Sequence, residues 1–561
     1  MIERRIGSDI DIAQQASMAP ISEVAAQLSL APEEWMPYGH YKAKLSTKVL
    51  SRLKDAPDGQ LILVTSINPT PAGEGKSTVT VGLGQALSRL GKRTIVALRE
   101  PSLGPNMGLK GGAAGGGYSQ LVPMDELNLH FTGDLHAITS ATNLLASLID
   151  NHLHQGNALG LDPRRVTWKR AVDLNDRALR QITVGLGGPG NGIPREDSFQ
   201  ITVASEIMAV LCLASDLDDL RERLGRMLIG WTWDQRPVQA RDLGAQGALT
   251  LLLKEAFNPN LIQTLEGTPA LVHGGPFANI AHGCNSLLAT RMALKLGELV
   301  VTEAGFGADL GAEKFLNIKA RIGELAPKAA VIVATVRALK MHGGAALNQL
   351  AEEDVEELKR GMAHLEKHIE TIQAFGLPLV VAINRFTSDT PRELSIALAW
   401  CEERGYPVAE SQVWAEGGAG GEALAHKVLA LIEQQRSAYA PLYPLEASIE
   451  EKLTILATQV YGGRGIELSA NAAQQLAALK RLGWDQLCVC VAKTQYSLSD
   501  DPSLLGRPRD FVLHVREFQV SLGAGFVVAL TGSVMTMPGL PKRPAALDMD
   551  VLPDGRAIGL F

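Results

Sequence analysis

The stretch from residue 61 to residue 90 constrains the fold more than any other part of the chain. Residues 61–64 form an apolar run typical of a buried strand, and residues 78–90 have the apolar spacing of a helix, although Gly82 and Gly84 weaken it. Between them lies the turn Thr70-Pro71-Ala72-Gly73-Glu74-Gly75-Lys76-Ser77. A strand, a glycine-rich turn and a helix in this order predict an α/β unit with a loop at a helix N-terminus.

Such a loop can wrap a polyphosphate in backbone N–H groups. Gly73 and Gly75 would let the backbone approach the phosphates, Lys76 would reach the β and γ oxygens, and Ser77 would hold Mg²⁺ through its hydroxyl. Thr70 stands where the first glycine of such loops usually lies. A Gly-Lys-Ser sequence can also be a simple turn, but the flanking strand and helix favour nucleotide binding. We therefore expect the eight residues 70–77 to bind ATP.

Short apolar runs and long helical stretches alternate through the middle of the chain. The runs at 61–67, 94–99, 181–184, 299–304, 330–336, 378–383 and 408–413 predict strands, and several are apolar throughout. Helical stretches at 205–213, 353–374 and 422–437 intervene. Parallel strands covered by helices on both faces have this pattern. It predicts a P-loop-type, doubly wound, mostly parallel sheet in an α/β fold.

A chain of 561 residues is long enough for roughly two to four domains. Residues 1–60 have a helical, amphipathic pattern and are interpreted as an entry segment rather than a core. Residues 61–445 form the α/β region, with a less regular insertion near 150–290. Valine-rich strands at 486–492, 511–519 and 526–530 predict a smaller α+β region over 446–561.

Arg99 and Glu100 come at the end of the strand that follows the first helix, which is the edge where doubly wound sheets bind ligands. An arginine there can hold a carboxylate or phosphate with two parallel N–H···O bonds. The alternative is a salt bridge between Arg99 and Glu100 themselves or with a neighbour.

Residues 108–118 hold six glycines bracketed by Lys110 and Tyr118. Glycines lose much conformational entropy on ordering, so such a loop is expected where backbone approaches something closely. A flexible linker is the alternative, but the surrounding sequence is not typical of a linker. We interpret the loop as a wall of the active site.

Composition excludes several classes of protein. A formal net charge of −7 disfavours a nucleic-acid surface. No stretch reaches the roughly 18 to 20 apolar residues that span a bilayer, and residues 1–30 lack the core of a signal peptide. The five scattered cysteines include no Cys-x-x-Cys pair, which is typical of reduced core thiols in the cytoplasm.

Two long segments carry a resemblance to a known family. Residues 108–118 and 333–344 resemble the two signature segments of formate–tetrahydrofolate ligases, also called 10-formyltetrahydrofolate synthetases. The segments 70–77, 99–105, 302–309, 384–386, 413–418, 492–496 and 535–541 are also similar to that family. The resemblance covers essentially the whole chain, fits the monofunctional form, and includes the unusual Thr70 of the loop.

The resemblance implies an enzyme of one-carbon metabolism that uses ATP to join formate to tetrahydrofolate, giving 10-formyltetrahydrofolate, ADP and phosphate through formyl phosphate. Lys76 and Arg99 are then the expected catalytic residues, with Arg99, Glu100 and Tyr118 at the formate or formyl phosphate. It also implies Mg²⁺ bound with ATP at Ser77, a monovalent cation (K⁺ or NH₄⁺), small-molecule substrates only, and a homotetramer.

Aromatic residues make up only 5% of the chain, so those at glycine-rich or strand-end positions attract notice. The resemblance assigns Phe306, Phe386 and Trp414 to the folate site, where rings can stack on the pterin. From the residues alone, each of the three is more often a core aromatic than a ligand contact.

Two other functions compete with the ligase. One is a nucleotide-switch ATPase acting through a partner, DNA or a membrane, for which neither a membrane helix nor a basic face is evident. The other is an acyl-phosphate ligase for a different carboxylate. His364 and His368, four residues apart, have the spacing of a metal site, but Arg360, Glu366 and Lys367 indicate a solvated helix face instead.

Overall fold

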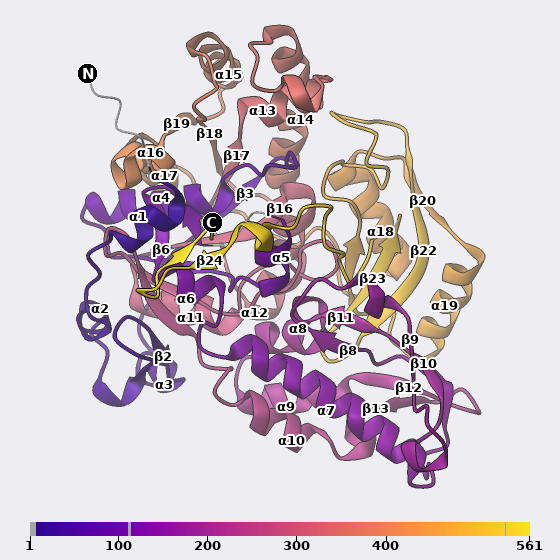
Figure 1. Cartoon of the computed structure of the whole chain (residues 1–561). Coiled ribbons are helices and arrows are strands. Elements are labelled where there is room, and N and C mark those ends of the chain that lie inside the picture. Colours follow the sequence, from indigo (N-terminus) through magenta and orange to yellow (C-terminus); the bar gives the residue numbers. More distant parts are fainter. Residues whose placement is uncertain (1–6, 110–113, 533, 561) are drawn as a thin grey trace.

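The computed structural model describes residues 7–109, 114–532 and 534–560 (Figure 1). Its centre is a large sheet whose middle strands run parallel to their neighbours. In spatial order these strands are β15 (Pro269–Val272), β4 (Thr94–Leu98), β16 (Leu299–Gly307), β3 (Gln60–Ser66), β17 (Ala329–Ala334), β18 (Leu379–Asn384) and β19 (Val408–Ser411). The predicted large, mostly parallel sheet in an α/β fold is confirmed, with strand ends that differ by a few residues from the prediction.

Both faces of this sheet are covered. Ile62 and Val64 of β3 pack in one apolar cluster with α4 (Lys76–Arg89) and α17 (Glu422–Gln434). Leu61 and Leu63 point the other way, into the main core cluster with α11 (Leu287–Leu296) and α14 (Val355–Ala374). Because side chains alternate along a strand, a strand segment buried on both faces is expected to be a continuous apolar run, as residues 61–64 of β3 are.

Antiparallel strands extend the sheet beyond β15. β14 (Asn260–Thr264) pairs with β15, with β2 (Ala43–Leu45) and with β6 (Ser119–Val122). β1 (Trp35–Pro37) pairs with β2, and β5 (Gly115–Gly116) pairs with β6.

The N-terminal segment is more than the helical entry segment that its sequence predicts. It contains α1 (Asp9–Gln14), α2 (Ile21–Gln27) and α3 (Lys48–Arg52), but also β1 and β2 of the main sheet. Ala43, Leu45 and Val49 are fully buried. The prediction was wrong on this point because β2 is a three-residue strand whose partner, β14, lies more than two hundred residues later in the chain.

The insertion forms a separate layer below the main sheet in Figure 1. The predicted strand 181–184 exists as β9 but pairs with β10 in a two-stranded sheet, so its expected place beside the parallel strands was wrong. The insertion's elements are α7 (Asp134–His154), β7 (Leu161–Val166), β8 (Arg170–Val172), β9 (Ile182–Val184), β10 (Arg195–Asp197), β11 (Phe199–Ile201), α8 (Glu206–Leu213), α9 (Leu217–Arg226), β12 (Leu228–Thr232), β13 (Pro237–Gln239) and α10 (Gln246–Leu253).

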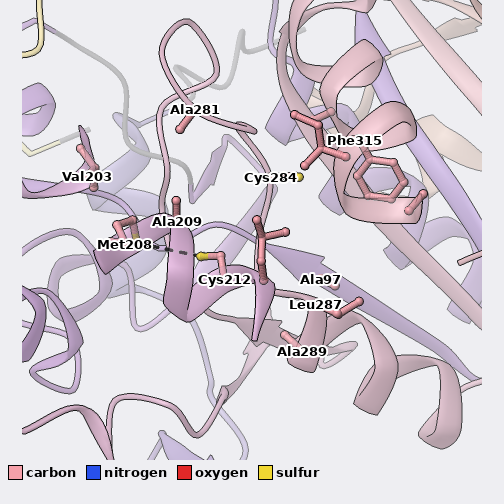
Figure 2. Packing of buried hydrophobic residues seen from close by; sticks show 14 of the residues in the cluster. Ala97, Val203, Met208, Ala209, Cys212, Ala281, Cys284, Leu287, Ala289 and Phe315 are labelled. Atoms are coloured by element: carbon pink, nitrogen blue, oxygen red, sulfur yellow. Dashed lines mark hydrogen bonds between the residues drawn. The ribbon is translucent and has the colours of Figure 1, made fainter. Parts of the chain in front are cut away.

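Helix α8 joins the insertion to the main core. Figure 2 shows Met208 and Cys212 of α8 close to Leu287 and Ala289 of α11, all of them buried. All five cysteines are buried free thiols, as the sequence predicts for core residues. Burial raises the pKa of Cys284 and Cys490 to about 11, so these thiols are inert at neutral pH.

The C-terminal region has its own sheet, in the order β20-β22-β23-β21, and its own apolar cluster. The three predicted valine-rich strands are confirmed as β21 (Cys488–Ala492), β22 (Val512–Ser521) and β23 (Phe526–Thr531). The region also contains α18 (Ile449–Ile455), β20 (Gly465–Leu468) and α19 (Ala470–Arg481), and β24 (Asp550–Val551) and β25 (Ala557–Ile558) lie near its end.

The remaining helices are short connections, except for α15. They are α5 (Leu103–Gly108), α6 (Met124–Asn128), α12 (Arg321–Gly323), α13 (Val336–Gly343), α15 (Pro391–Glu403) and α16 (Val413–Glu416). Within the described ranges, every helix is too short or too polar to cross a membrane.

Candidate active site at the carboxyl edge of the main sheet

The loop between β3 and α4 has the predicted layout of strand, glycine-rich turn and helix. Gly73 and Gly75 have positive φ angles of 80° and 66°, which residues with a Cβ rarely adopt. Helix α4 begins at Lys76, directly after Gly75. The loop therefore ends at a helix N-terminus whose first N–H groups lack partners inside the helix.

Glu74 braces the loop from the protein side. Its Oε1 accepts a hydrogen bond of 2.7 Å from the backbone N of Thr70, and its Oε2 accepts one from the hydroxyl of Thr335. Burial raises the pKa of Glu74. The carboxyl group of Glu74 thus faces inward. Backbone groups of the loop, rather than this side chain, are available to contact a ligand.

Asn384, the last residue of β18, fixes the same loop from the other side. Its Nδ2 donates a hydrogen bond of 3.0 Å to the carbonyl of Glu74. A Cβ on Gly75 would lie 2.5 Å from that nitrogen, so any other residue there would displace the Asn384 side chain.

Lys76 and Ser77 converge on Glu303, a residue of β16 that sequence reasoning did not single out. Lys76 forms an ion pair with Oε2 of Glu303, and the Ser77 hydroxyl donates to the same oxygen at 2.8 Å. Glu303 is 0% exposed. Burial raises the pKa of Glu303, but the charges of Lys76 and Arg99 outweigh burial and hold it below its usual value. Glu303 is therefore a charged carboxylate under the loop.

Arg99 follows β4 and reaches the same carboxylate, with Nη2 3.6 Å from Oε1 of Glu303. Its Nη1 donates to the carbonyl of Pro276 at 3.4 Å, and its buried Nε has no partner among the described residues. The alternative of a salt bridge is confirmed with a neighbour, Glu303, and not with Glu100. The structure thus brings Arg99 beside Lys76, at the mouth of the loop.

Glu100 points away from this group. It is 4% exposed, and burial together with the charge of Asp134 raises its pKa well above the usual value. Arg99 and Glu100, adjacent in the sequence, therefore lie on opposite sides of the strand end and do not share one environment.

The predicted aromatic residues are all half-buried, but they do not meet in one stack. Phe386 lies under the guanidinium of Arg337, 3.7 Å from the ring centre, and close to Gly75. Phe306 has a positive φ of 60°, and its carbonyl accepts a hydrogen bond of 2.9 Å from the Ser66 hydroxyl. In the described part of the chain, no ring–ring contact joins Phe306 or Phe386 to another ring.

Trp414 and Tyr118 are in direct backbone contact. The Tyr118 backbone N donates to the Trp414 carbonyl at 2.9 Å, and Tyr118 is 43% exposed. A Cβ on Gly117 would lie 2.1 Å from that carbonyl, so the glycines at this end of the loop allow close backbone packing. Residues 110–113, including the predicted Lys110, lie outside the described residues. The described end of the loop is packed on the protein, unlike a linker.

Several residues at this edge were missed because each belongs to, or directly follows, a different strand. Glu303 belongs to β16, Thr335 follows β17, and Asn384 ends β18. The carboxyl ends of parallel strands meet at one edge of a sheet, which is the signal that could have found them.

The arrangement can hold a polyphosphate and a metal ion. Lys76, Arg99 and the start of α4 supply positive charge, which suits phosphate or carboxylate oxygens. The Ser77 hydroxyl and the Glu303 carboxylate provide two oxygens within hydrogen-bond distance, and Oε1 of Glu303 is buried without a hydrogen-bond partner in the described structure. Oxygen ligands of this kind fit Mg²⁺.

Comparison with known protein families gives one match over almost the whole chain. The family model described as formate–tetrahydrofolate ligase matches residues 7–561. The match includes the loop 70–77, Arg99, Glu303 and the three aromatic residues assigned from the sequence.

Proposed function

Because the chain belongs to the formate–tetrahydrofolate ligase family, we propose that it forms 10-formyltetrahydrofolate through an enzyme-bound formyl phosphate. Family membership itself establishes a ligase that joins formate to tetrahydrofolate. The observation that carries the finer proposal is the convergence of Lys76, Ser77 and Arg99 on Glu303 at the mouth of a glycine loop. We further propose that the sheet is of the P-loop type and that residues 70–77 bind ATP.

Formate needs activation because it is a stabilised anion and a poor electrophile. In the first step an oxygen of formate forms a bond to the γ-phosphorus of ATP, and the bond from that phosphorus to ADP breaks. Lys76 and the N–H groups at the start of α4 offset charge on the phosphates, and Arg99 orients formate in line with the breaking bond. The products of this step are formyl phosphate and ADP.

In the second step the N10 amine of tetrahydrofolate forms a bond to the formyl carbon. The bond from that carbon to the phosphate oxygen breaks, and N10 loses its proton. Arg99 stabilises the charge of the departing phosphate, while Glu100 and Tyr118 remain the proposed neighbours of the formyl group. The buried position of Glu100 favours an indirect role for it.

Mg²⁺ would be held by Ser77 and Glu303 and would neutralise charge on the phosphates when bound. For Glu303 to reach the metal, Lys76 must exchange this carboxylate for the phosphates. We assign no residue to the monovalent cation, K⁺ or NH₄⁺, that family resemblance implies. The homotetramer and the cytoplasmic location are likewise proposals; the five free thiols support the second.

Phe306, Phe386 and Trp414 are proposed to line the folate site. Each is half-buried, so part of each ring is available to a ligand. One face of Phe386 is already covered by Arg337, which leaves its other face for stacking.

The proposal is tested by measuring ADP release with formate and tetrahydrofolate, singly and together, and by following ¹⁸O from labelled formate. We expect sustained ADP release only with both substrates and ¹⁸O in the released phosphate. ADP release without either substrate would favour a nucleotide switch, and release only with a larger acid would favour another ligase. Product formation without ¹⁸O transfer would contradict formyl phosphate.

A further inference from the structure

Three histidines form a buried cluster beside the candidate active site. His342 lies in the last turn of α13, and His364 and His368 lie on α14. The rings of His342 and His364 stack, with centroids 3.6 Å apart and planes within 14°, and His368 meets His364 edge-on at 4.6 Å. The solvated face expected for His364 and His368 is wrong: both are 0% exposed, because this side of α14 packs on α13 and on the C-terminal region.

The cluster grips one residue of the C-terminal region, Gly506. The backbone N of Gly506 donates to Nδ1 of His342 at 3.2 Å, and Nδ1 of His364 donates to the carbonyl of Gly506 at 2.6 Å. Both backbone groups of one residue are thus held by two stacked rings. Gly506 has a φ of 70°, and a Cβ there would lie 2.7 Å from the carbonyl oxygen of His342.

On its other side the cluster holds Asn68, two residues before the loop 70–77. Nε2 of His342 donates to the Asn68 carbonyl at 3.0 Å. Nε2 of His368 lies 3.2 Å from Oδ1 and 3.3 Å from the backbone N of Asn68. Asn68 is fully buried, so these contacts fix the main chain where β3 passes into the loop.

The side chain of Asn68 ties the same point to two further segments. Its Nδ2 donates to Asp309 at 3.1 Å and to the carbonyl of Gln495 at 3.0 Å. Asp309 in turn forms a fully buried ion pair of 2.6 Å with Lys493. The C-terminal region therefore reaches the start of the loop through two of its own segments, with the Lys493 side chain and Gln495 carbonyl from one and the backbone of Gly506 from the other.

All three rings are neutral. Burial lowers the pKa of each histidine well below the ordinary value, and the charge of a neighbouring histidine lowers it further. A neutral ring has one N–H, and His364 uses its own on Gly506, so its Nε2, 3.2 Å from Nε2 of His368, carries no proton.

We propose that three positioning residues hold the loop 70–77 in place against the C-terminal region. They are His342, His364 and His368, which together we call the histidine clasp. Docking of Gly506 into the clasp fixes Asn68, and Asn68 fixes the approach of the chain to Gly73 and Gly75. The proposal rests on the proposed role of residues 70–77 in nucleotide binding. It gives the C-terminal region a part in nucleotide affinity, although its sheet lies apart from the loop (Figure 1).

The test compares matched variants from both sides of the clasp. Gly506→Ala strains the docked backbone, whereas Gly483→Ala imposes the same backbone strain, at a φ of 71°, with nothing within 4 Å of the added Cβ. His364→Leu removes the donor to Gly506, and His364→Asn keeps a donor at a similar position. Calorimetry measures the affinity for MgADP, and steady-state kinetics measure KM for ATP and for tetrahydrofolate.

We expect Gly506→Ala and His364→Leu to weaken MgADP binding and raise the KM for ATP about fivefold, as the loss of one buried hydrogen bond would. The KM for tetrahydrofolate should change less than twofold. His364→Asn should recover most of the affinity, and Gly483→Ala should leave it unchanged. The two substitutions His364→Leu and Gly506→Ala affect the same contact. The double variant should therefore lose little more MgADP affinity than either single variant.

Equal effects of Gly506→Ala and Gly483→Ala, or unchanged MgADP affinity in Gly506→Ala, would overturn the clasp. Should His364→Leu fail to fold, Gly506→Ala and His364→Asn still decide the question. Lys76→Ala separates the two proposals. If it leaves MgADP binding intact, the nucleotide role of the loop fails; if it abolishes binding while Gly506→Ala does not weaken it, only the clasp fails.

Discussion

The carboxylate of Glu303 is the residue-scale centre of the candidate active site. It contacts Lys76 and Ser77 from the start of α4 and Arg99 from the end of β4. Lys76 and Glu303 are 227 residues apart in the chain, so no local pattern relates them. Lys76, Ser77 and Arg99 were predictable because their local sequence is distinctive, whereas Glu303 lies inside an apolar strand with no such mark.

Replacing Glu303 by glutamine should lower the thermal midpoint of the ligand-free protein. Lys76 and Arg99 would then share a buried site without a counter-charge, which costs about 3 kcal/mol when one partner of a buried pair is removed. Added ATP should restore more of the midpoint than it does in the unmodified protein. Glu298→Gln, which breaks an exposed pair with Arg93, is the control, and an equal midpoint in both variants would contradict the assignment.

Lys76→Ala should reduce phosphoryl transfer at least about 100-fold, as the loss of one transition-state donor does. Binding of tetrahydrofolate, followed by fluorescence, should stay within about twofold. Lys92→Ala, at an exposed position just beyond α4, is the matched control. Loss of both phosphoryl transfer and tetrahydrofolate binding in Lys76→Ala would mean that this lysine has a structural role.

Trp414→Ala should raise the KM for tetrahydrofolate more than the KM for ATP. A stacked ring adds about 0.5–1.5 kcal/mol beyond burial, which corresponds to roughly a two- to twelvefold rise. Steady-state kinetics with each substrate varied in turn provide the measurement. Equal changes in both constants would argue against stacking on the folate, since Trp414 also supports Tyr118.

At the scale of elements, β3, the loop and α4 were predictable as a unit because they are continuous in the sequence. The turn residues, the apolar strand and the helical spacing all agree locally. By contrast, β2 was not predicted, and β9 was assigned to the wrong sheet. Both are three-residue strands, and the partner that decides the sheet to which each belongs is not visible in their own sequence.

Gly75→Ala tests the unit formed by β3, the loop and α4. Alanine at a φ of 66° costs about 1 kcal/mol, and its Cβ would displace Asn384, which holds the loop. We expect MgATP affinity to fall about tenfold, measured by calorimetry. Gly91→Ala has the same backbone strain, at a φ of 78°, but nothing within 4 Å, so it should bind MgATP normally. Equal losses in the two variants would show that strain alone, and not the contact with Asn384, is responsible.

At the scale of the whole molecule, buried titratable groups predict the pH dependence of stability. Burial lowers the pKa of His273 to about 4 and of His282 to about 3, and the histidine clasp behaves likewise. Below about pH 6.5 these histidines become protonated in the unfolded chain but stay neutral in the folded chain. The free energy of unfolding therefore decreases as the pH is lowered below 6.5, by about 1.4 kcal/mol per histidine and pH unit.

Buried carboxyl groups act in the opposite direction. Burial raises the pKa of Glu206 to about 8 and of Glu313 to about 7. Above about pH 4.5 the unfolded chain loses these two protons while the folded chain keeps them, so their contribution falls as pH rises toward 8. Glu74 and Glu100 act in the same direction, because burial raises the pKa of each. The histidines contribute no pH dependence above about pH 6.5, so thermal midpoints should fall as the pH rises from 6.5 toward 8. A midpoint still rising from pH 6.5 to 7.5 would contradict this balance.

The sequence by itself determined the α/β class, the glycine-rich loop between β3 and α4, and the family, because each depends on residues that are neighbours in the chain. Only the tertiary structure decided the partner of Lys76 and Arg99, the inward turn of Glu74, and the joining of β2 to the main sheet. It also decided the burial of the three histidines around Gly506. These features depend on contacts between segments far apart in the chain, and such contacts exist only once the parallel strands align their carboxyl ends at one edge.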